Sequence, residues 1–178
     1  SRILFSGLQG EELMLNILRE LPDEYTVLSD LNVKFEDKES QIDNLVVGPN
    51  GVFVIETKNL NGRIEGSDEQ KYWIQNKTGR KGGEYDKDFY NPAKQVGGHV
   101  YTLSSLLKQN NIEAWVQGIV FFSNIDARVN AHSDKVPIFD FLHNGDNKLF
   151  EYIVQFSSKE KISIEEQGKI IDIIKNCV

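Results

Sequence analysis

The chain has few residues of the types that build covalent or metal cross-links. Cys177 is the single cysteine among 178 residues, so an intrachain disulfide is excluded, and so is a zinc site built on several cysteines. The three histidines, His99, His132 and His143, are scattered and form no HxxxH or HExxH motif, which disfavours a zinc hydrolase. This cysteine usage suits a reducing compartment, and we expect a cytoplasmic protein.

Long apolar runs are also lacking. No stretch approaches the ~20 apolar residues that a membrane span needs, and no basic-then-apolar signal segment opens the chain. Hydrophobic residues make up 39% of the chain and charged residues 26%, which is close to the globular average and disfavours disorder or a coiled coil. We therefore expect a single globular domain over residues 1–178, with no membrane partner.

Positive charge is in the minority. The chain has 20 Lys and Arg against 27 Asp and Glu, a formal net charge of −7. This balance disfavours tight metal-free binding of nucleic acid, because such binding depends on neutralising phosphates. It does not exclude an enzyme that holds phosphate through a bound cation, since a metal inverts the field of an acidic site.

The hydrophobic periodicity predicts an α/β domain with a mixed sheet. Gly48-Pro49-Asn50-Gly51 is a strong turn signal between two strands, and Asn91-Pro92 is typical of a helix start. The predicted helices cover 7–21, a segment from 91 onward, 147–156 and 164–176. The predicted strands cover 25–35, 41–47, 52–58, 115–122 and 136–139, with short additions around Ile64 and 72–75.

The strand predicted over 52–58 ends in charged residues. Side chains alternate along a strand, so Glu56 and Lys58 point to one face and Thr57 points to the other. If Lys58 lies beside acids and a metal, its ammonium is suited to steer a water and to neutralise charge developing on a phosphate.

The register of the hairpin decides what Glu56 faces. A two-residue turn at 49–50 puts Asp43 directly opposite Glu56, with Cβ atoms roughly 5 Å apart. A three-residue loop would instead put Asp43 opposite Thr57. Two carboxylates that close repel each other unless one is protonated or a cation lies between them. Oxygen ligands without His or Cys suit Mg²⁺ or Mn²⁺.

Two further polar residues are candidates for the same site. On a helical wheel Glu11 falls beside Met14 and Leu18, at the edge of the apolar face, where an acid either snorkels or serves a site. Gln95 lies near the start of the second helix, where unpaired N–H groups favour an anion. His99, one turn later, is equally compatible with a supporting place near the site and with a surface position.

The loop 77–83 is locally basic within an acidic chain. Its composition is compatible with contact to a phosphate backbone, but a flexible solvated loop is the favoured interpretation.

Taken in order, these motifs resemble the nuclease-related domain (NERD) family of the PD-(D/E)XK nuclease-like superfamily. The resemblance covers roughly residues 3–122 and implies a restriction-endonuclease-like αβββαβ core, a central mixed sheet flanked by helices. A C-terminal strand and extra helices over about 136–178 would complete the domain. The motifs that carry the resemblance are Gly7-x-x-Gly10-Glu11, Gln41-Ile42-Asp43, Gly51-Val52-Phe53-Val54-Ile55-Glu56-Thr57-Lys58, Gly62, Trp73 and Asn91-Pro92-x-x-Gln95.

The resemblance implies a metal-dependent nuclease that hydrolyses phosphodiester bonds in DNA processing. Asp43, Glu56, Glu11 and the Thr57 carbonyl would bind Mg²⁺ or Mn²⁺. Lys58 and Gln95 would complete the catalytic set. The alternative function is a catalytically weak or inactive binding or scaffold module, since the superfamily contains members that have lost catalysis.

The sequence departs from the family pattern at one position beside the predicted site. Many relatives carry His after the Asp, where this chain has Asn44, a difference that leaves the Asp-Glu-Lys set intact.

The expected partners are nucleic acid, with DNA favoured over RNA, and either a second copy of the chain or a partner domain outside this sequence.

Overall fold

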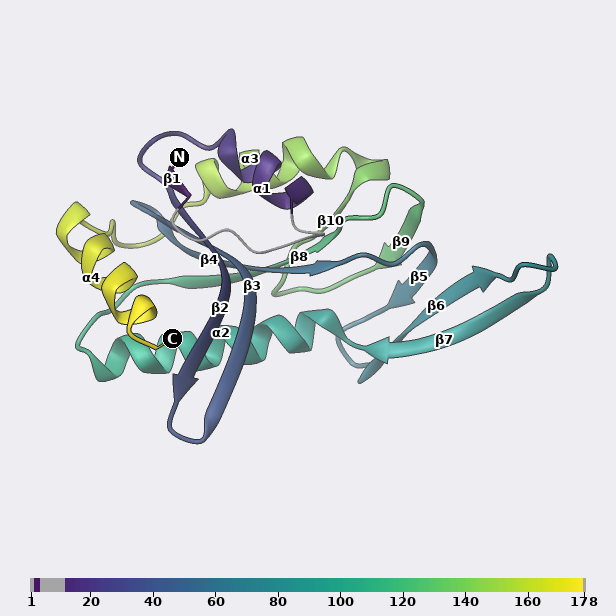
Figure 1. Ribbon diagram of the computed structural model, residues 1–178, viewed down its shortest axis with the longest axis horizontal. Coiled ribbons are helices and arrows are strands. Elements are labelled where there is room, and N and C mark those ends of the chain that lie inside the picture. The colour runs from purple at the N-terminus through teal and green to yellow at the C-terminus, as the bar shows by residue number, and fades with distance from the viewer. Residues whose placement is uncertain (1, 4–11, 178) are drawn as a thin grey trace.

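The computed structural model describes residues 2–3 and 12–177, and these form two β-sheets with helices packed around the larger one (Figure 1). The larger sheet has the strand order β1-β2-β3-β4-β8-β10, and the smaller one has the order β7-β6-β5-β9. The strands of the larger sheet are β1 (Arg2–Ile3), β2 (Thr26–Phe35), β3 (Lys38–Gly48), β4 (Gly51–Lys58), β8 (Val116–Phe122) and β10 (Ile138–Asp140). The strands of the smaller sheet are β5 (Gly62–Gly66), β6 (Tyr72–Thr78), β7 (Glu84–Tyr90) and β9 (Ala127–Ala131). The helices are α1 (Glu12–Arg19), α2 (Pro92–Gln109), the short 3₁₀ turn η1 (Phe141–His143), α3 (Gly145–Gln155) and α4 (Ile164–Lys175).

The larger sheet is mixed, as predicted. The strands β2, β3 and β4 pair antiparallel, whereas β8 pairs parallel to β4 and β10 parallel to β8. Strand β4 therefore has a hydrogen-bonded neighbour on each side, and its residues 51–56 are all buried. Such a strand reads in sequence as a continuous apolar run, which is why it could be identified.

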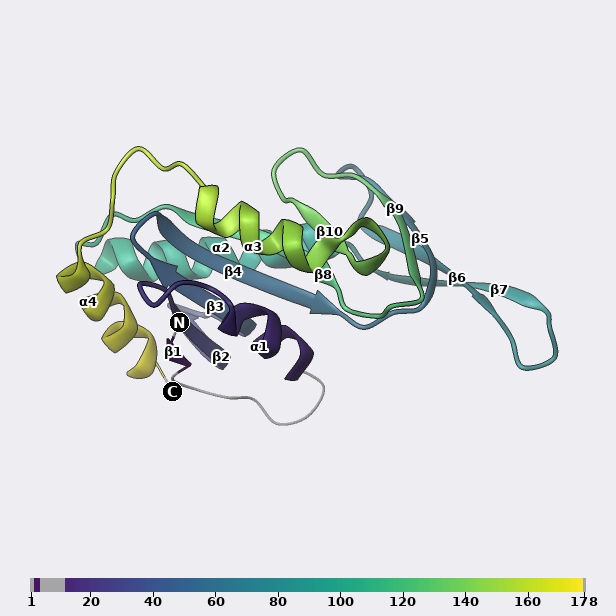
Figure 2. The same cartoon turned by 90° about the horizontal axis from the view of Figure 1, so that it is seen from above.

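Helices cover both faces of this sheet. Alternate residues of β3 and β4 feed two separate cores, because strand side chains point to opposite faces. Val47 and Val54 pack with residues of α2 and α4, whereas Val46 and Phe53 pack with residues of α1 and α3. Figure 1 shows α2 on one side of the sheet and α1 with α3 on the other, and Figure 2 gives the same molecule from above.

Helix α2 begins where the sequence predicts. The Asn91 side chain accepts hydrogen bonds from the N–H groups of Ala93 and Lys94, and Pro92 takes the first helical position, where a missing N–H costs nothing. Its Val96 and Leu103 are fully buried against the sheet. The helix thus presents one face to the end of β4, where the predicted site residues lie.

Most predicted elements agree with the structure to within a few residues, but three strands were not predicted. The helix predicted over 7–21 is described only from Glu12 onward, and its first turn, with Glu11, lies outside the described residues. The prediction omitted β1, β7 and β9, and it gave β6 only in part. Strand β7 is exposed along nearly its whole length, so its sequence has no apolar alternation to find.

A helix that crosses a membrane must be long and apolar. None of the helices within residues 12–177 is long and apolar enough to cross a membrane.

Candidate active site

The hairpin between β3 and β4 has the register of a two-residue turn. Gly48 pairs with Gly51, and the ladder continues in that register as far as the pair Asn44–Ile55. This confirms the two-residue turn at 49–50 and excludes the three-residue loop that was its alternative. The β3–β4 ladder ends at that pair, and Asp43 and Glu56 are the residues that follow it on each strand.

The carboxylates of Asp43 and Glu56 lie close together. The main-chain N–H of Thr57 donates to Asp43 Oδ2 over 3.1 Å, so the Asp43 carboxylate lies against the end of β4. Glu56 lies on the face of Val54, the face that α2 covers. Strict alternation does not place Asp43, because Ile42 and Val47 of β3 both pack in the core on the α2 side. The charges of Glu56, Lys58 and His99 act on Asp43, so its carboxylate lies near theirs.

Glu56 is held between two basic side chains. Its Oε1 lies 3.2 Å from Lys58 Nζ, and its Oε2 lies 3.5 Å from His99 Nε2 on α2. The Glu56 side chain is only 6% exposed, whereas that of Lys58 is 23% exposed. A buried carboxylate is thus matched by a cation that still reaches solvent. We call Asp43, Glu56, Lys58 and His99 the carboxylate site.

The surroundings of Asp43 disfavour its charged form. Burial raises the pKa of the Asp43 carboxyl above its ordinary value, and the nearby charge of Glu56 raises it further. The Thr57 N–H, Lys58 and His99 act in the opposite direction but do not cancel the rise in this pKa. A net rise in the pKa of Asp43 is what is expected when two carboxylates share a site without enough positive charge between them.

His99 is the site residue whose place the sequence left open. It lies four residues after Gln95, and positions four apart share a face of a helix. Its Nε2 is buried and has no hydrogen-bond partner among the described residues, although Glu56 is near. The sequence signal for His99 was its position one helical turn after Gln95, on the helix that follows the predicted strands. Gln95 itself is half-buried, and its main-chain N–H donates to the Asn91 carbonyl.

Thr57 and Asn44 point to the other face of the sheet. Thr57 Oγ1 is buried without a hydrogen-bond partner within residues 12–177, while the Thr57 N–H is taken by Asp43. Asn44 is fully buried, and its Oδ1 accepts a hydrogen bond from Ser29 Oγ over 2.8 Å. Asn44 therefore belongs to the packing of the face opposite the carboxylate site.

The described part of the site offers two carboxylates to a metal. Within residues 2–3 and 12–177 there is no group of three or more His, Cys, Asp or Glu side chains arranged to hold a metal ion. Glu11, the predicted third acid, lies outside these residues. The donors that are described are oxygen atoms of Asp43 and Glu56, which is the ligand chemistry of a hard divalent cation.

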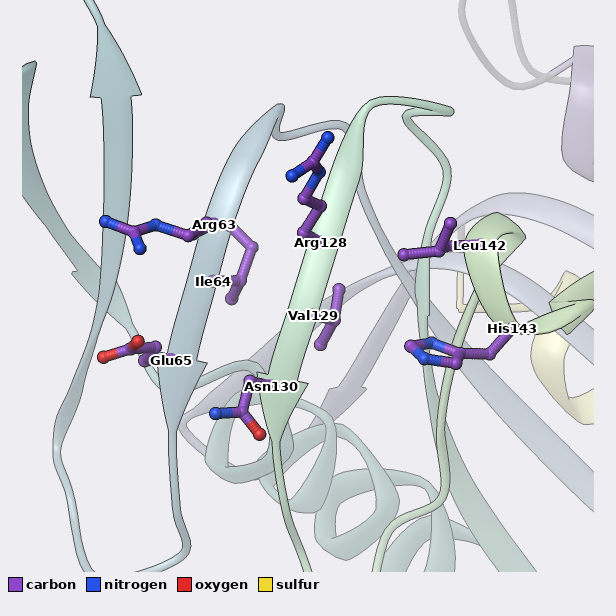
Figure 3. Close-up of a pocket in the computed structure, with 8 residues that line it drawn as sticks. All are labelled: Arg63, Ile64, Glu65, Arg128, Val129, Asn130, Leu142 and His143. Carbon is purple, nitrogen blue, oxygen red and sulfur yellow. The ribbon is translucent and has the colours of Figure 1, made fainter.

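A separate pocket of about 200 Å³ lies on the smaller sheet (Figure 3). Strands β5 and β9 form it with η1, and it contains none of the residues of the carboxylate site. Its two arginines, Arg63 and Arg128, are direct neighbours in the parallel register of these strands. The other lining residues are Ile64, Glu65, Val129, Asn130, Leu142 and His143.

Comparison with known proteins places the chain in a family. The nuclease-related domain matches residues 6–123, well over half of the chain, and the chain therefore belongs to the NERD family. A Bacillus anthracis protein described as uncharacterized is 36% identical over 107 residues, which is 59% of this chain and 48% of that protein. The chain thus spans about half the length of this curated relative. No solved structure matches it significantly.

Proposed function

We propose that the chain is a divalent-metal-dependent nuclease that hydrolyses phosphodiester bonds in DNA. The family supports nuclease-related chemistry. The observation that carries the proposal is the geometry at the ends of two adjacent strands. There the Asp43 carboxylate lies near that of Glu56, and the Lys58 ammonium lies 3.2 Å from Glu56.

Asp43 and Glu56 fit a divalent cation. The raised pKa of Asp43, caused by burial and by the charge of Glu56, reflects a repulsion that a cation between the carboxylates would relieve. In this proposal the Thr57 main-chain carbonyl and Glu11 supply further ligands. Bound Mg²⁺ or Mn²⁺ supplies a Lewis acid and lowers the pKa of water.

The other residues act on the phosphate and on the acids. Lys58 offers a partly exposed ammonium to the charge that develops on the phosphate, and it lies 3.2 Å from Glu56 Oε1. His99, on α2, lies with its Nε2 3.5 Å from Glu56 Oε2 and helps to orient that carboxylate. Gln95, one turn earlier on the same helix face, is placed to orient a water or a phosphate oxygen.

A second function is a binding or scaffold module with little or no catalysis. The net charge of −7 favours it, since an acidic chain gains little from phosphate without a cation. The two functions differ in what a divalent ion does to the protein.

A cleavage assay tests the nuclease proposal. Supercoiled plasmid, linear duplex, single-stranded DNA and RNA are incubated with Mn²⁺ or Mg²⁺ and the wild type, Asp43→Ala or Glu56→Ala. We expect cleavage of DNA by the wild type and none by either variant, with circular dichroism unchanged. Glu160→Ala, at an exposed position outside the site, is the matched control and should retain full activity. Full activity in both site variants would refute the proposal.

Thermal unfolding separates the nuclease from the scaffold module. A ligand that binds the folded state at about 100 times its Kd adds about 2.7 kcal/mol of stability. We expect Mn²⁺ to raise the Tm of the wild type and to leave that of Asp43→Asn unchanged. An equal response of both proteins would place the ion elsewhere and favour the scaffold module.

A further inference from the structure

The β6–β7 hairpin projects from the molecule as an arm. It consists of β6, β7 and the connecting residues 79–83, and Figures 1 and 2 both show its outer part extending beyond the rest of the smaller sheet, to which its strands belong. A two-stranded hairpin alone is marginally stable in water, so an extended one must be useful or supported. Its base is supported, because Trp73 is fully buried in the core that also contains Val96 of α2.

The strand register sorts the charges of the arm by face. Lys77 pairs with Tyr85 and Gln75 pairs with Lys87, so these four side chains share one face, which we call the basic face. The acids of β7 lie on the opposite face, opposite uncharged residues of β6. The pairs on that face are Thr78–Glu84, Asn76–Asp86 and Ile74–Asp88.

The arm does not use these charges to hold its own strands together. Opposite charges facing each other across two strands stabilise a hairpin, yet no lysine of the arm faces an acid here. Arg80 and Lys81 add two exposed cations at the tip. Among residues 12–177, no acid lies within ion-pair distance of Lys77, Arg80, Lys81 or Lys87. Four cations are therefore available to an outside partner.

The base of the basic face is anchored to the segment that follows β4. Gln75 is only 1% exposed, and its Nε2 donates to the main-chain oxygen of Asn61 over 2.8 Å. The part of this face that a ligand can reach is therefore formed by the half-buried Lys77 and the exposed Tyr85 and Lys87.

We propose that the basic face and tip of the arm bind the phosphate backbone of duplex DNA. This inference rests on the proposed function, since it supplies the same substrate with a second point of contact. Three of the four cations, Lys77, Arg80 and Lys81, lie within five residues at the outer end of the arm. The exposed Tyr85 hydroxyl, between the lysines, is of the type that donates to phosphate oxygens.

The arm also explains how an acidic chain can hold nucleic acid. Lys77 and Lys87 lie on the face opposite the acids of β7, and Arg80 and Lys81 lie at the tip, while the rest of the chain carries the net negative charge. Backbone contacts of this kind fix position and orientation but do not read sequence.

Salt-dependent binding to DNA tests the inference. The probe is a fluorescently labelled 30-base-pair duplex in EDTA, so that cleavage plays no part, and anisotropy gives Kd from 50 to 300 mM salt. The test variant is Lys77→Gln, Arg80→Gln, Lys81→Gln, Lys87→Gln together. We expect binding to weaken about tenfold or more, and the slope of log K against log salt to fall by up to ~3.6, or about 0.9 per phosphate contact.

Two control variants distinguish an effect of the arm's cations from a general effect of changing the protein's charge. Lys34→Gln, Lys108→Gln, Lys159→Gln, Lys161→Gln removes the same number of exposed cations elsewhere and should change the slope by less than about one unit. Glu84→Gln, Asp86→Asn, Asp88→Asn neutralises the other face of the arm and should leave the slope unchanged. Each variant is first shown to unfold at the wild-type Tm.

The outcomes distinguish this inference from the proposed function. Equal losses in the arm variant and the remote-lysine control overturn the inference, and so does unchanged binding by the arm variant. Wild-type protein that binds no duplex, or that binds only RNA through the arm, also overturns it. Cleavage with arm-independent binding leaves the nuclease proposal standing alone. Arm-dependent binding without any Mn²⁺-dependent cleavage supports the arm and refutes the nuclease.

Discussion

The Asp43 carboxylate accepts the main-chain N–H of Thr57 over 3.1 Å, one position beyond the last pair of the β3–β4 ladder. The side chain thereby takes the place of a strand carbonyl as the hydrogen-bond acceptor. One consequence is geometric, because the carboxylate is tied to the end of β4. The other is electrostatic, because this position keeps its charge close to that of Glu56.

Asp43→Asn should make the metal-free protein more stable at neutral pH. The folded-state pKa of Asp43 is raised by burial and by Glu56, whereas in the unfolded chain the group has its ordinary value. The contribution of Asp43 to stability is therefore present below the ordinary pKa and lost as pH rises through the raised one. Asparagine cannot ionise, although its Oδ1 can still accept the Thr57 N–H.

The Tm in EDTA, measured from pH 3.5 to 7.5, checks this. The difference between Asp43→Asn and the wild type should grow with pH across the range. Asp172→Asn, at an exposed position of α4, should show no such trend. A difference that is constant with pH, or a variant less stable than the wild type at pH 7, would contradict the electrostatic account.

Local sequence signals were sufficient to predict the hairpin that carries the site. Gly48 and Gly51 bracket a two-residue turn, and once that turn is fixed, the period of two assigns the side chains of residues 44–48 and of β4 to a face. The start of α2 was equally local, because the Asn91 cap and Pro92 act within one turn. The position of Glu56 followed from these short-range rules, whereas β3 changes face between Ile42 and Leu45, which the sequence did not indicate.

Features that depend on distant contacts could not be predicted. Strand β9 is recognisable only by its parallel pairing with β5, more than sixty residues earlier in the chain. Strand β7 has no apolar pattern and is ordered by its pairing with β6. The approach of His99 to Glu56 depends on how α2 packs on the sheet, a tertiary relation that sequence spacing leaves open.

Lys58→Gln should abolish most of the activity without loss of metal binding. Removing a group that stabilises charge in the transition state costs about 10²–10³ in kcat. Removing the ammonium also takes away a cation that competes with Mn²⁺ for Glu56, from which it lies 3.2 Å. The Mn²⁺ concentration that half-saturates the Tm shift should therefore stay the same or fall. Lys159→Gln is the matched control, and a weakened Mn²⁺ response in Lys58→Gln would assign Lys58 a structural role.

His99→Ala should impair the site through Glu56. The ring braces Glu56 Oε2 from 3.5 Å, and loss of a residue that orients a metal ligand typically costs 10–100-fold. We expect the Mn²⁺ concentration for half-maximal cleavage to rise by about tenfold while Tm in EDTA changes little. His132, whose side chain is 79% exposed, provides the control variant His132→Ala. Equal Mn²⁺ dependence in both variants would remove His99 from the carboxylate site.

Asn91→Ala should destabilise the junction of α2 with the base of the arm. The Asn91 side chain is fully buried, and its Oδ1 accepts from the N–H groups of Ala93 and Lys94. Its Nδ2 donates to the carbonyls of Ser67 and Gln70, over 3.2 and 2.8 Å. Alanine removes the cap, worth about 1 kcal/mol, and leaves buried backbone groups unpaired at about 1–3 kcal/mol.

The free energy of unfolding of Asn91→Ala in urea should therefore fall by about 2–4 kcal/mol. Asn147→Ala is the matched control, because Asn147 is exposed and its side chain donates a hydrogen bond to the neighbouring Asn144 side chain. That control should stay within about 0.5 kcal/mol of the wild type. If Asn91→Ala behaved like Asn147→Ala, the four hydrogen bonds of Asn91 could not be what joins α2 to residues 67–70, and the arm would need another anchor.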